Sequence, residues 1–301
     1  MKIFRIILCA IVLCGSLRAL SLGAGADDSS YRQSVEKWRQ DYENNLRSDD
    51  GWLTVSGLFW LHEGENRFGA DPLNDIVLPG ASVPREAGSF SFHNGKTVLH
   101  ANQNATMTLN GKPVQTAELR ADSSSDRVHL GDLTLYVDAS GERYAIRVKD
   151  RNSKFRKGFT GLHWFPVDES YRLSARFIAY SPAKQVAIQN VLGDFDKVSI
   201  VGYVVFSLQG NEYRLDAEQD EPNSLFFVFR DLSSGKETYP AARFLDTDVP
   251  SNGSVTLDFN KAYNPPCAYN PYTTCPLPTP GNRLRVAIRA GEQNYNHEHE
   301  N

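Results

Sequence analysis

The chain has 301 residues, 41% of them hydrophobic and 23% charged, which is long enough to bury a sizeable core as one large domain or two small ones. Its formal net charge is −4, and without the first 26 residues 29 basic residues stand against 36 acidic ones, a net charge of −7. This acidic balance argues against nucleic acid or an anionic membrane surface as a partner.

Residues 1–26 have the pattern of a secretory signal. The start is positively charged, residues 6–14 are an apolar core, and residues 24–26 read Ala-Gly-Ala, an A-x-A cleavage site. A bilayer span needs about 20 apolar residues, so this core is too short, and no later run approaches that length. We expect an exported protein, periplasmic or extracellular, with no transmembrane segment in the mature chain. Cleavage near Ala19 and a lipid anchor on Cys14 are the alternatives.

Residues 27–50 are expected to form an N-terminal helix, with its regular part at 30–48. Apolar positions recur there at spacings of four, three, four and four, which places them on one face. Ser30 with Gln33 fits a capping box, and Gly51 follows the end. The pattern predicts a packing helix whose buried face carries Tyr31, Val35, Trp38, Tyr42 and Leu46.

After Gly51 the pattern changes to β. Short apolar runs alternate with turn signals, of which Asn94-Gly95 and Asn110-Gly111 are strong hairpin signals. Gly131-Asp132 and Ser140-Gly141 are turns of the same kind. Strands at this spacing, without helices between them, predict a β-sandwich over residues 51–146.

Part of this region has a more specific pattern. The stretches GENRFGADPLNDIVLPGASVPREAGSF, TLNGKPV and RVHLGDLTLYV resemble the forkhead-associated sandwich, which recognises phosphothreonine. In that family an arginine follows the first glycine, and a serine and a histidine complete the phosphate site. Here Ala70 follows Gly69, Pro84 precedes Arg85, and Ala87 stands where the histidine would be. The resemblance therefore implies a degenerate sandwich without phosphopeptide function.

A second β-rich module is expected over residues 147–292, followed by a flexible polar tail at 293–301. Its predicted strands include SARFIAYS, the SIVGYVVFSLQ and EYRLDA pair, SLFFVFRD, ARFL, SVTLDF and RLRVAIRA. Gly210-Asn211 is expected to close the hairpin of that pair. With no helical pattern between these strands, an antiparallel sheet, a barrel or a second sandwich is predicted.

A proline-rich segment with two cysteines lies within this module, between Asp258 and Glu292. Proline fixes φ and removes a backbone donor, so the segment is neither a helix nor a central strand. In an exported protein a disulfide between Cys267 and Cys275 is the first interpretation. Their spacing is too wide for a C-x-x-C redox pair or a usual zinc site, and a catalytic cysteine would need a histidine partner.

A basic stretch begins at the start of the same module. Seven basic residues lie between Arg147 and His163, either as a solvated loop or as a wall that attracts anions, since arginine forks match carboxylates and phosphates. If this stretch meets the polar residues of later strands, the result is a pocket for a small polar or anionic ligand. The candidate ligand-binding residues are Arg147, Lys149, Asp150, Tyr239, Arg243, Asp258 and Asn264. An ion pair of Arg243 with Asp258 is the structural alternative.

Known catalytic motifs are missing from the sequence. It has no G-x-S-x-G elbow, P-loop, G-x-G-x-x-G or H-E-x-x-H motif, so no metal, no cofactor and no catalytic residue is assigned. Binding of a small polar or anionic molecule is the leading hypothesis. One alternative is a hydrolase or lyase with Asp258 or Asp150 as base and Tyr239 or Arg243 stabilising negative charge. The other is a structural envelope protein without a ligand.

Four stretches together carry a resemblance to one family. They are GWLTVSGLFWLHEGENRFG, RVKDRNSKFRKGFTGLHWFPVD, TYPAARFL and, most specifically, DFNKAYNPPCAYNPYTTCPLPTPGNRL followed by AGE. Over residues 31–292 the chain resembles the bacterial domain-of-unknown-function 1684 family. Thr279 and Gly281 depart from the proline and acidic residue usual there. The resemblance implies a family identity and no activity, because no reaction is established for that family.

Overall fold

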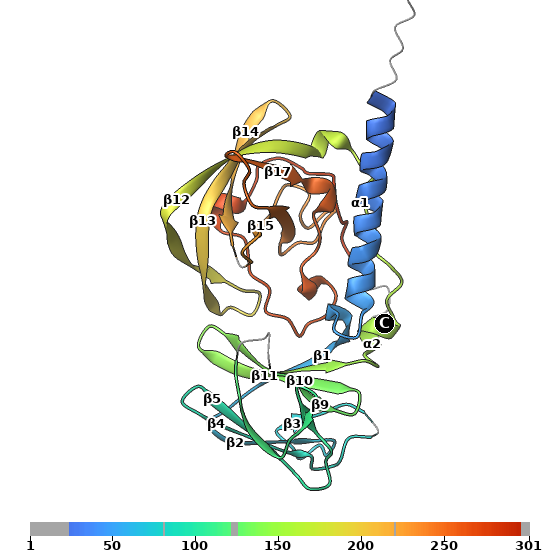
Figure 1. Cartoon of the computed structure of the whole chain (residues 1–301), viewed down its shortest axis with the longest axis vertical. Helices are drawn as coiled ribbons and strands as arrows, with labels where there is room; N and C mark the ends of the chain where they lie inside the picture. The colour runs from blue at the N-terminus through green and yellow to red at the C-terminus, as the bar shows by residue number, and fades with distance from the viewer. Residues whose placement is uncertain (1–23, 81, 122–125, 220, 296–301) are drawn as a thin grey trace, which may run out of the picture.

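The computed structural model describes residues 24–80, 82–121, 126–219 and 221–295. Residues 1–23 of the predicted leader and residues 296–301 of the predicted tail lie outside the described residues. The expected fold class is confirmed: the chain is mostly β, with one long N-terminal helix and several antiparallel sheets. Figure 1 shows two β bodies, one above the other, with helix α1 (Ala24–Arg47) along one side of the upper body.

The lower body is a sandwich of two sheets. Hydrophobic side chains of both sheets meet in one core, where the Phe68 and Phe90 rings stack with centroids 4.6 Å apart. One sheet has the order β1 (Val55–Trp60), β11 (Arg143–Asp150), β10 (Leu133–Ser140), β9 (Val128–Leu130), β6 (Thr108–Leu109) and β7 (Lys112–Pro113). The other has β3 (Ile76–Val77), β2 (Gly64–Gly69), β4 (Gly88–His93), β5 (Lys96–Ala101) and β8 (Thr116–Leu119).

The two hairpin turns predicted from Asn-Gly pairs adopt the left-handed backbone conformation. Asn94 and Gly95 have φ values of 49° and 79°, and Asn110 and Gly111 have the same two values. Asparagine and glycine accept this region at little cost, which explains why N-G marks both turns. The division of the chain between residues 146 and 147 stays a prediction, and that point falls inside β11.

The upper body is a strongly curved six-stranded sheet. Its order is β16 (Arg243–Asp248), β15 (Ser224–Phe229), β14 (Asn211–Glu218), β13 (Phe195–Leu208), β12 (Arg172–Gln189) and β17 (Ser254–Asp258). Just after β17, Tyr263 exchanges two 2.9 Å backbone hydrogen bonds with Phe244 of β16, so the two ends of the sheet are joined. An apolar core, including the buried rings of Phe227, Phe229 and Phe259, fills the interior.

Two sequence expectations for the upper body need correction. The β13–β14 hairpin turns at Gln209 and Gly210, with φ values of 51° and 78°, one residue earlier than expected, because Leu208 pairs with Asn211. The RLRVAIRA segment is not a regular strand. Its alternate side chains are buried, from Leu284 to Ala290, but only its beginning pairs with the backbone after β15.

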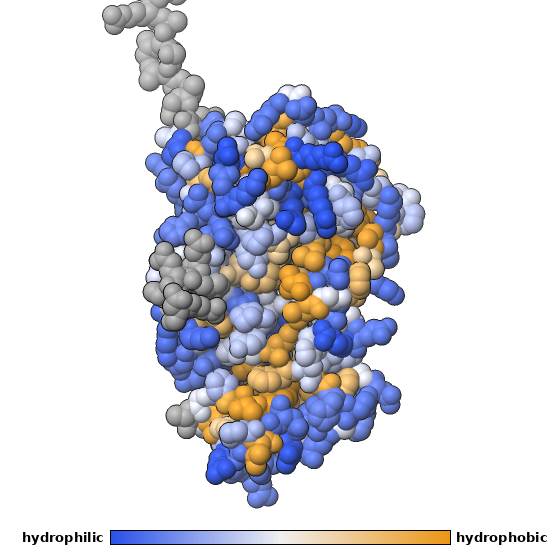
Figure 2. All heavy atoms as spheres, turned by 180° about the vertical axis from the view of Figure 1, so that it is seen from behind, coloured by the Kyte–Doolittle hydropathy of each residue, from blue (hydrophilic) through white to orange (hydrophobic). Residues whose placement is uncertain are grey.

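Short helices connect and fix these elements. They are η1 (Trp52–Thr54), α2 (Lys154–Lys157), η2 (Glu169–Tyr171), η3 (Phe259–Lys261), η4 (Pro266–Ala268) and η5 (Pro280–Asn282). Three of them, η3 to η5, divide the proline-rich segment, which is therefore ordered. No helix among the described residues combines the length and apolarity that a bilayer crossing requires. On the face seen in Figure 2, most side chains are hydrophilic, and apolar ones gather in narrow stripes.

Candidate functional site

The end of the proline-rich segment brings a glutamate into the interior of the upper body. Gly291 has a φ of +80°, and a Cβ there would lie 2.3 Å from the carbonyl oxygen of Ala262. Only glycine fits this close approach. The next residue, Glu292, donates its backbone N–H to the same carbonyl at 2.8 Å, and its side chain is 1% exposed.

Glu292 is the acceptor at the centre of a buried polar network. Its carboxylate accepts from the backbone N–H and the side-chain amide of Asn264, each at 2.8 Å, and from the Tyr269 hydroxyl at 2.8 and 2.9 Å. The Tyr42 hydroxyl of α1 lies 3.4 Å from that of Tyr269 and donates to the Asn264 carbonyl at 3.3 Å. Burial raises the pKa of Glu292 to about 8, although the hydrogen bonds from Asn264 and Tyr269 oppose the rise.

A second buried network contains the predicted residue Arg243. Its guanidinium pairs with Asp231 at 2.8 Å, both side chains being fully buried, and donates to the carbonyls of Ile288, at 2.9 Å, and Ala290. Asp231 also accepts from the N–H of Ile288 at 3.2 Å. This ion pair replaces a strand partner for the segment around Ile288, which explains why RLRVAIRA is extended without being a strand. Arg243 does not pair with Asp258.

Two more predicted residues lie beside the cysteines. The Tyr239 hydroxyl donates to the Cys267 carbonyl at 2.9 Å. Arg147, on β11, pairs with Asp138 at 2.7 Å and donates to the Thr274 hydroxyl at 3.1 Å, next to Cys275. Both cysteines are free thiols, so the expected disulfide is not formed in this structure.

The remaining predicted residues lie elsewhere. Asp258 is buried and accepts from the Tyr31 hydroxyl of α1 at 2.7 Å, which fixes the helix to β17. Lys149 donates to the Asp50 carbonyl at 2.6 Å, and Asp150 accepts from the N–H of Asn152 at 2.7 Å in a turn. The seven candidates therefore do not form a single site. Arg243 and Asn264 share the surroundings of Glu292, and Arg147 and Tyr239 share those of the cysteines.

The upper body also carries a groove that none of the seven lines. It has a volume of about 550 Å³ and lies over neighbouring strands β17, β12, β13 and β14. Arg172 and Arg176 line it from β12, with Glu212 from β14. Antiparallel partners project to the same face of a sheet, so Arg176 shares its face with its partners Ser254 and Val205. The lining residues are Arg172, Leu173, Ser174, Arg176, Val205, Phe206, Ser207, Glu212, Gly253 and Ser254.

The charged side chains that line this groove differ in their contacts with the rest of the chain. The Arg172 guanidinium lies 4.9 Å from the centroid of the Tyr31 ring, so α1 supports it. The side chains of Arg176 and Glu212 form no hydrogen bond or ion pair with the described part of the chain. Their charges are thus both available to a bound molecule.

Sequence reasoning missed Glu292, Arg172 and Arg176. Glu292 ends the Ala-Gly-Glu motif, but a single glutamate after a strand-like segment does not reveal that the preceding glycine turns its side chain inward. The signal for the groove is Arg172-Leu173-Ser174-Ala175-Arg176, whose alternation puts the charged and hydroxyl side chains on one face of a strand.

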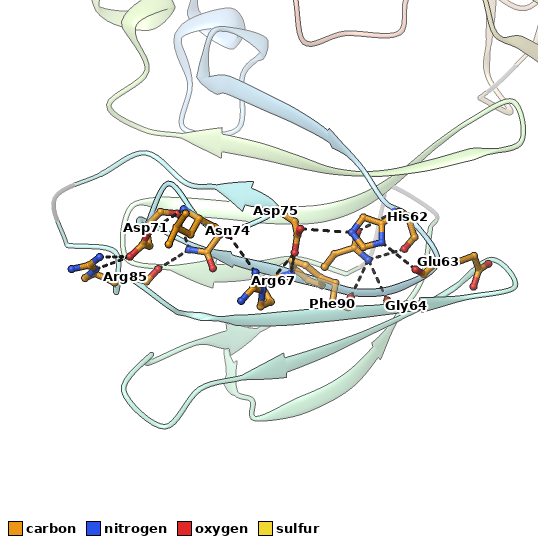
Figure 3. A network of polar contacts seen from close by, with 11 residues as sticks. His62, Glu63, Gly64, Arg67, Asp71, Asn74, Asp75, Arg85 and Phe90 are labelled. Carbon is orange, nitrogen blue, oxygen red and sulfur yellow. Dashed lines mark hydrogen bonds and ion pairs between the residues drawn. The ribbon is translucent and has the colours of Figure 1, made fainter.

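The lower sandwich has its own polar face, at the loops that resemble the forkhead-associated family. Figure 3 shows the contacts there: Arg85 pairs with Asp71, with its Nε 2.8 Å from Oδ2, and Asn74 donates to the Arg85 carbonyl at 2.7 Å. Arg67 donates its backbone N–H to Asp75 at 2.8 Å. The Arg85 guanidinium is thus engaged with a carboxylate of its own chain.

Within the described residues, no group of three or more His, Cys, Asp or Glu side chains is arranged to hold a metal ion. Glu292, the most perturbed carboxyl, is enclosed by hydrogen-bond donors and not by further carboxylates or imidazoles. Its surroundings support a structural or proton-linked role.

A known family model matches the part of the chain that contains the upper body. Residues 157–293 match the family model described as protein of unknown function (DUF1684). An uncharacterized protein from Haloarcula marismortui, solved in solution, is 33% identical; the match covers 48% of this chain and 81% of that protein, with a TM-score of 0.40. No curated protein matches this chain.

Forkhead-associated (FHA) domains are among the similar solved structures. The FhaA FHA domain, solved in complex with the intracellular domain of Rv3910, is 22% identical; the match covers 31% of this chain and 97% of that domain, with a TM-score of 0.23. EmbR of Mycobacterium tuberculosis, solved with a low-affinity phosphopeptide, is 15% identical over 42% of this chain and 31% of that one, with a TM-score of 0.23.

Proposed function

Because residues 157–293 of this chain belong to the family of proteins of unknown function DUF1684, we propose a function from the chain's own geometry: it is an exported protein that binds a small anionic or polar molecule in the groove over β12, β13 and β17. The observation that carries this proposal is the groove lining, which combines two arginines with three serine hydroxyls. Guanidinium groups match carboxylates and phosphates, and hydroxyls add directional hydrogen bonds.

Arg176 is the residue on which binding depends most. Its side chain has no partner of its own chain among the described residues, so an anion would gain a charge-assisted hydrogen bond without breaking an existing contact. Arg172 would act from the other end, held over the Tyr31 ring. The binding hypothesis formed from the sequence is kept, but the proposed site moves from the seven candidates to this groove.

The binding test uses succinate and inorganic phosphate as probes, at constant ionic strength balanced with NaCl. A ligand at 100 times its Kd stabilises the folded state by about 2.7 kcal/mol, which raises the Tm of a chain of this size by roughly 5–10 °C. We expect one of the probes to raise the Tm, and Arg176→Ala to lose that rise while keeping the Tm without ligand. Lys197→Ala, an exposed basic residue on β13 outside the groove lining, is the matched control.

Two results would count against binding in the groove. If neither probe raises the Tm more than NaCl does, the proposal fails and the structural envelope hypothesis gains support. If Arg176→Ala and Lys197→Ala respond alike, the anion binds elsewhere. Chemical turnover of a bound probe would favour the hydrolase or lyase alternative.

Export rests on the leader pattern of residues 1–26 and is tested separately. The full-length chain, expressed in a bacterial host, should be found outside the cytoplasm with a new N-terminus near Asp27, whereas a chain without residues 1–26 should stay inside. Retention of both forms in the cytoplasm would overturn the assignment.

A further inference from the structure

Cys267 and Cys275 lie together in the upper body, where Cys275 belongs to a small buried apolar cluster and Cys267 packs against it. The backbone N–H of Cys267, on η4, donates to the Cys275 sulfur at 3.3 Å, and the two thiols are in hydrogen-bond contact. Tyr239 holds the carbonyl of Cys267, and the carbonyl of Cys275 accepts from the N–H of Val191 at 3.0 Å. Both cysteines are therefore positioned by contacts of their backbone, independently of any bond between their sulfurs.

The two thiols differ in access and in charge. Cys267 is half-buried, whereas Cys275 is only 6% exposed. Burial alone would raise the pKa of the Cys275 thiol, but its hydrogen bonds with Cys267 and Thr273 and the charge of Arg147 hold it below its ordinary value. The hydrogen bond to Cys275, together with burial, raises the pKa of Cys267. A dissolved disulfide therefore reaches Cys267, the less buried residue, more easily, whereas the thiolate form is favoured at Cys275.

We propose that this pair is a thiol–disulfide exchange site for a low-molecular-weight disulfide, with Cys267 as the thiol that reacts first and Cys275 as the thiol that resolves the intermediate. The site differs from a permanent structural disulfide, because its two thiols have distinct roles. It is also independent of the groove, which neither cysteine lines.

The exchange has two balanced steps. Cys267 loses its proton and attacks one sulfur of the small disulfide, whose S–S bond breaks and whose other half leaves as a thiolate that takes up a proton. Cys275 then loses its proton, attacks the Cys267 sulfur and releases the second half in the same way. The two cysteines are oxidised by two electrons to a disulfide, and the small disulfide is reduced to two thiols.

Reduced protein is incubated with oxidised glutathione, quenched with iodoacetamide and digested with trypsin. Both cysteines fall in one tryptic peptide, residues 262–283, separate from the two cysteines of the leader. We expect this peptide to become lighter by two hydrogen atoms and to carry no alkyl group, and the Tm of the oxidised protein to rise. Two alkylated thiols after incubation would overturn the proposal.

Single-cysteine variants test the two roles. In Cys275→Ser, glutathione should accumulate on Cys267, whereas in Cys267→Ser the enclosed Cys275 should remain a thiol. Glutathione on Cys275 of the second variant, or equal modification of both, would contradict the assignment. Should either variant fail to fold, the rate of alkylation in the unchanged protein decides instead. Cys267 is expected to react faster than Cys275, and the reverse order would refute the proposal.

Discussion

Among the described carboxyl groups, Glu292 is the one whose ionisation is most strongly coupled to folding. Its carboxyl has a pKa of about 8 in the folded chain and 4.5 as an ordinary value, because burial disfavours the charged form. A raised folded pKa gives a contribution to stability that is complete below about pH 4.5 and is lost as pH rises to about 8. In that window each pH unit removes up to about 1.4 kcal/mol from the free energy of unfolding.

We predict that Glu292→Gln removes this slope. The free energy of unfolding of the unchanged protein minus that of the variant should fall between pH 5 and pH 8, measured by urea denaturation, and groups common to both cancel in the difference. At pH 5 the variant should be the less stable of the two, because a glutamine NH₂ would face one of the Asn264 donors. A difference that is constant with pH would contradict the role assigned to Glu292.

Arg243 shows the cost of removing one member of a buried ion pair. Arg243→Met would leave Asp231 charged and unpaired and two carbonyls without their donor. We expect the free energy of unfolding to fall by about 3–5 kcal/mol. Arg289→Met, in the exposed pair with Glu237, should change it by no more than about 1 kcal/mol. Both variants are measured by denaturation with guanidinium chloride. Equal losses of the free energy of unfolding would refute the distinction between the buried and the exposed ion pair.

At the scale of elements, Gly291 and Gly210 share a backbone conformation but not their surroundings. Their φ values are +80° and +78°, yet a Cβ at Gly291 would lie 2.3 Å from the Ala262 carbonyl, whereas nothing lies within 4 Å at Gly210. We predict that Gly210→Ala costs only the left-handed conformation, about 1–2 kcal/mol. Gly291→Ala should lower the Tm further and speed hydrogen exchange at the Glu292 amide. Similar losses for both variants would show that the close approach is unimportant.

The sequence predicted the elements whose signals are local. The spacing from Tyr31 to Leu46 predicted α1, and the N-G pairs predicted two hairpins where they occur. The prediction that RLRVAIRA forms a strand was wrong. Its side chains do alternate between buried and exposed, but the backbone around Ile288 is hydrogen-bonded by the Arg243–Asp231 ion pair and not by a neighbouring strand. Among site residues, the sequence predicted Arg243 and Asn264 as ligand-binding candidates, but it did not reveal that Asn264 hydrogen-bonds to Glu292, 28 residues later. Pairings of that kind are long-range and leave no local pattern.

On the scale of the whole molecule, the two β bodies have separate hydrophobic cores and meet through polar contacts. The β10–β11 turn of the sandwich contacts the β12–β13 turn of the upper body. Asp194 accepts from the Ser140 hydroxyl at 2.9 Å and from Arg143 at 2.9 and 2.5 Å, and the Asn190 amide donates to Ser140 at 2.7 Å. These hydrogen bonds couple the two bodies at this turn, together with the contact of Arg147 with Thr274.

We therefore predict that the double variant Ser140→Ala, Arg143→Ala weakens the cooperativity of unfolding. It removes the side-chain hydrogen bonds from the sandwich to Asp194 and leaves the backbone hydrogen bond from Gly141 to Asp196 in place. Calorimetry should show a single transition for the unchanged protein and a broadened or split one for the variant, since the bodies then unfold more independently. Arg67→Ala, which removes an ion pair inside the sandwich, should shift the transition without splitting it. A variant that unfolds as cooperatively as the unchanged protein would mean that other contacts, such as that of Asn270 with Trp52, carry the coupling.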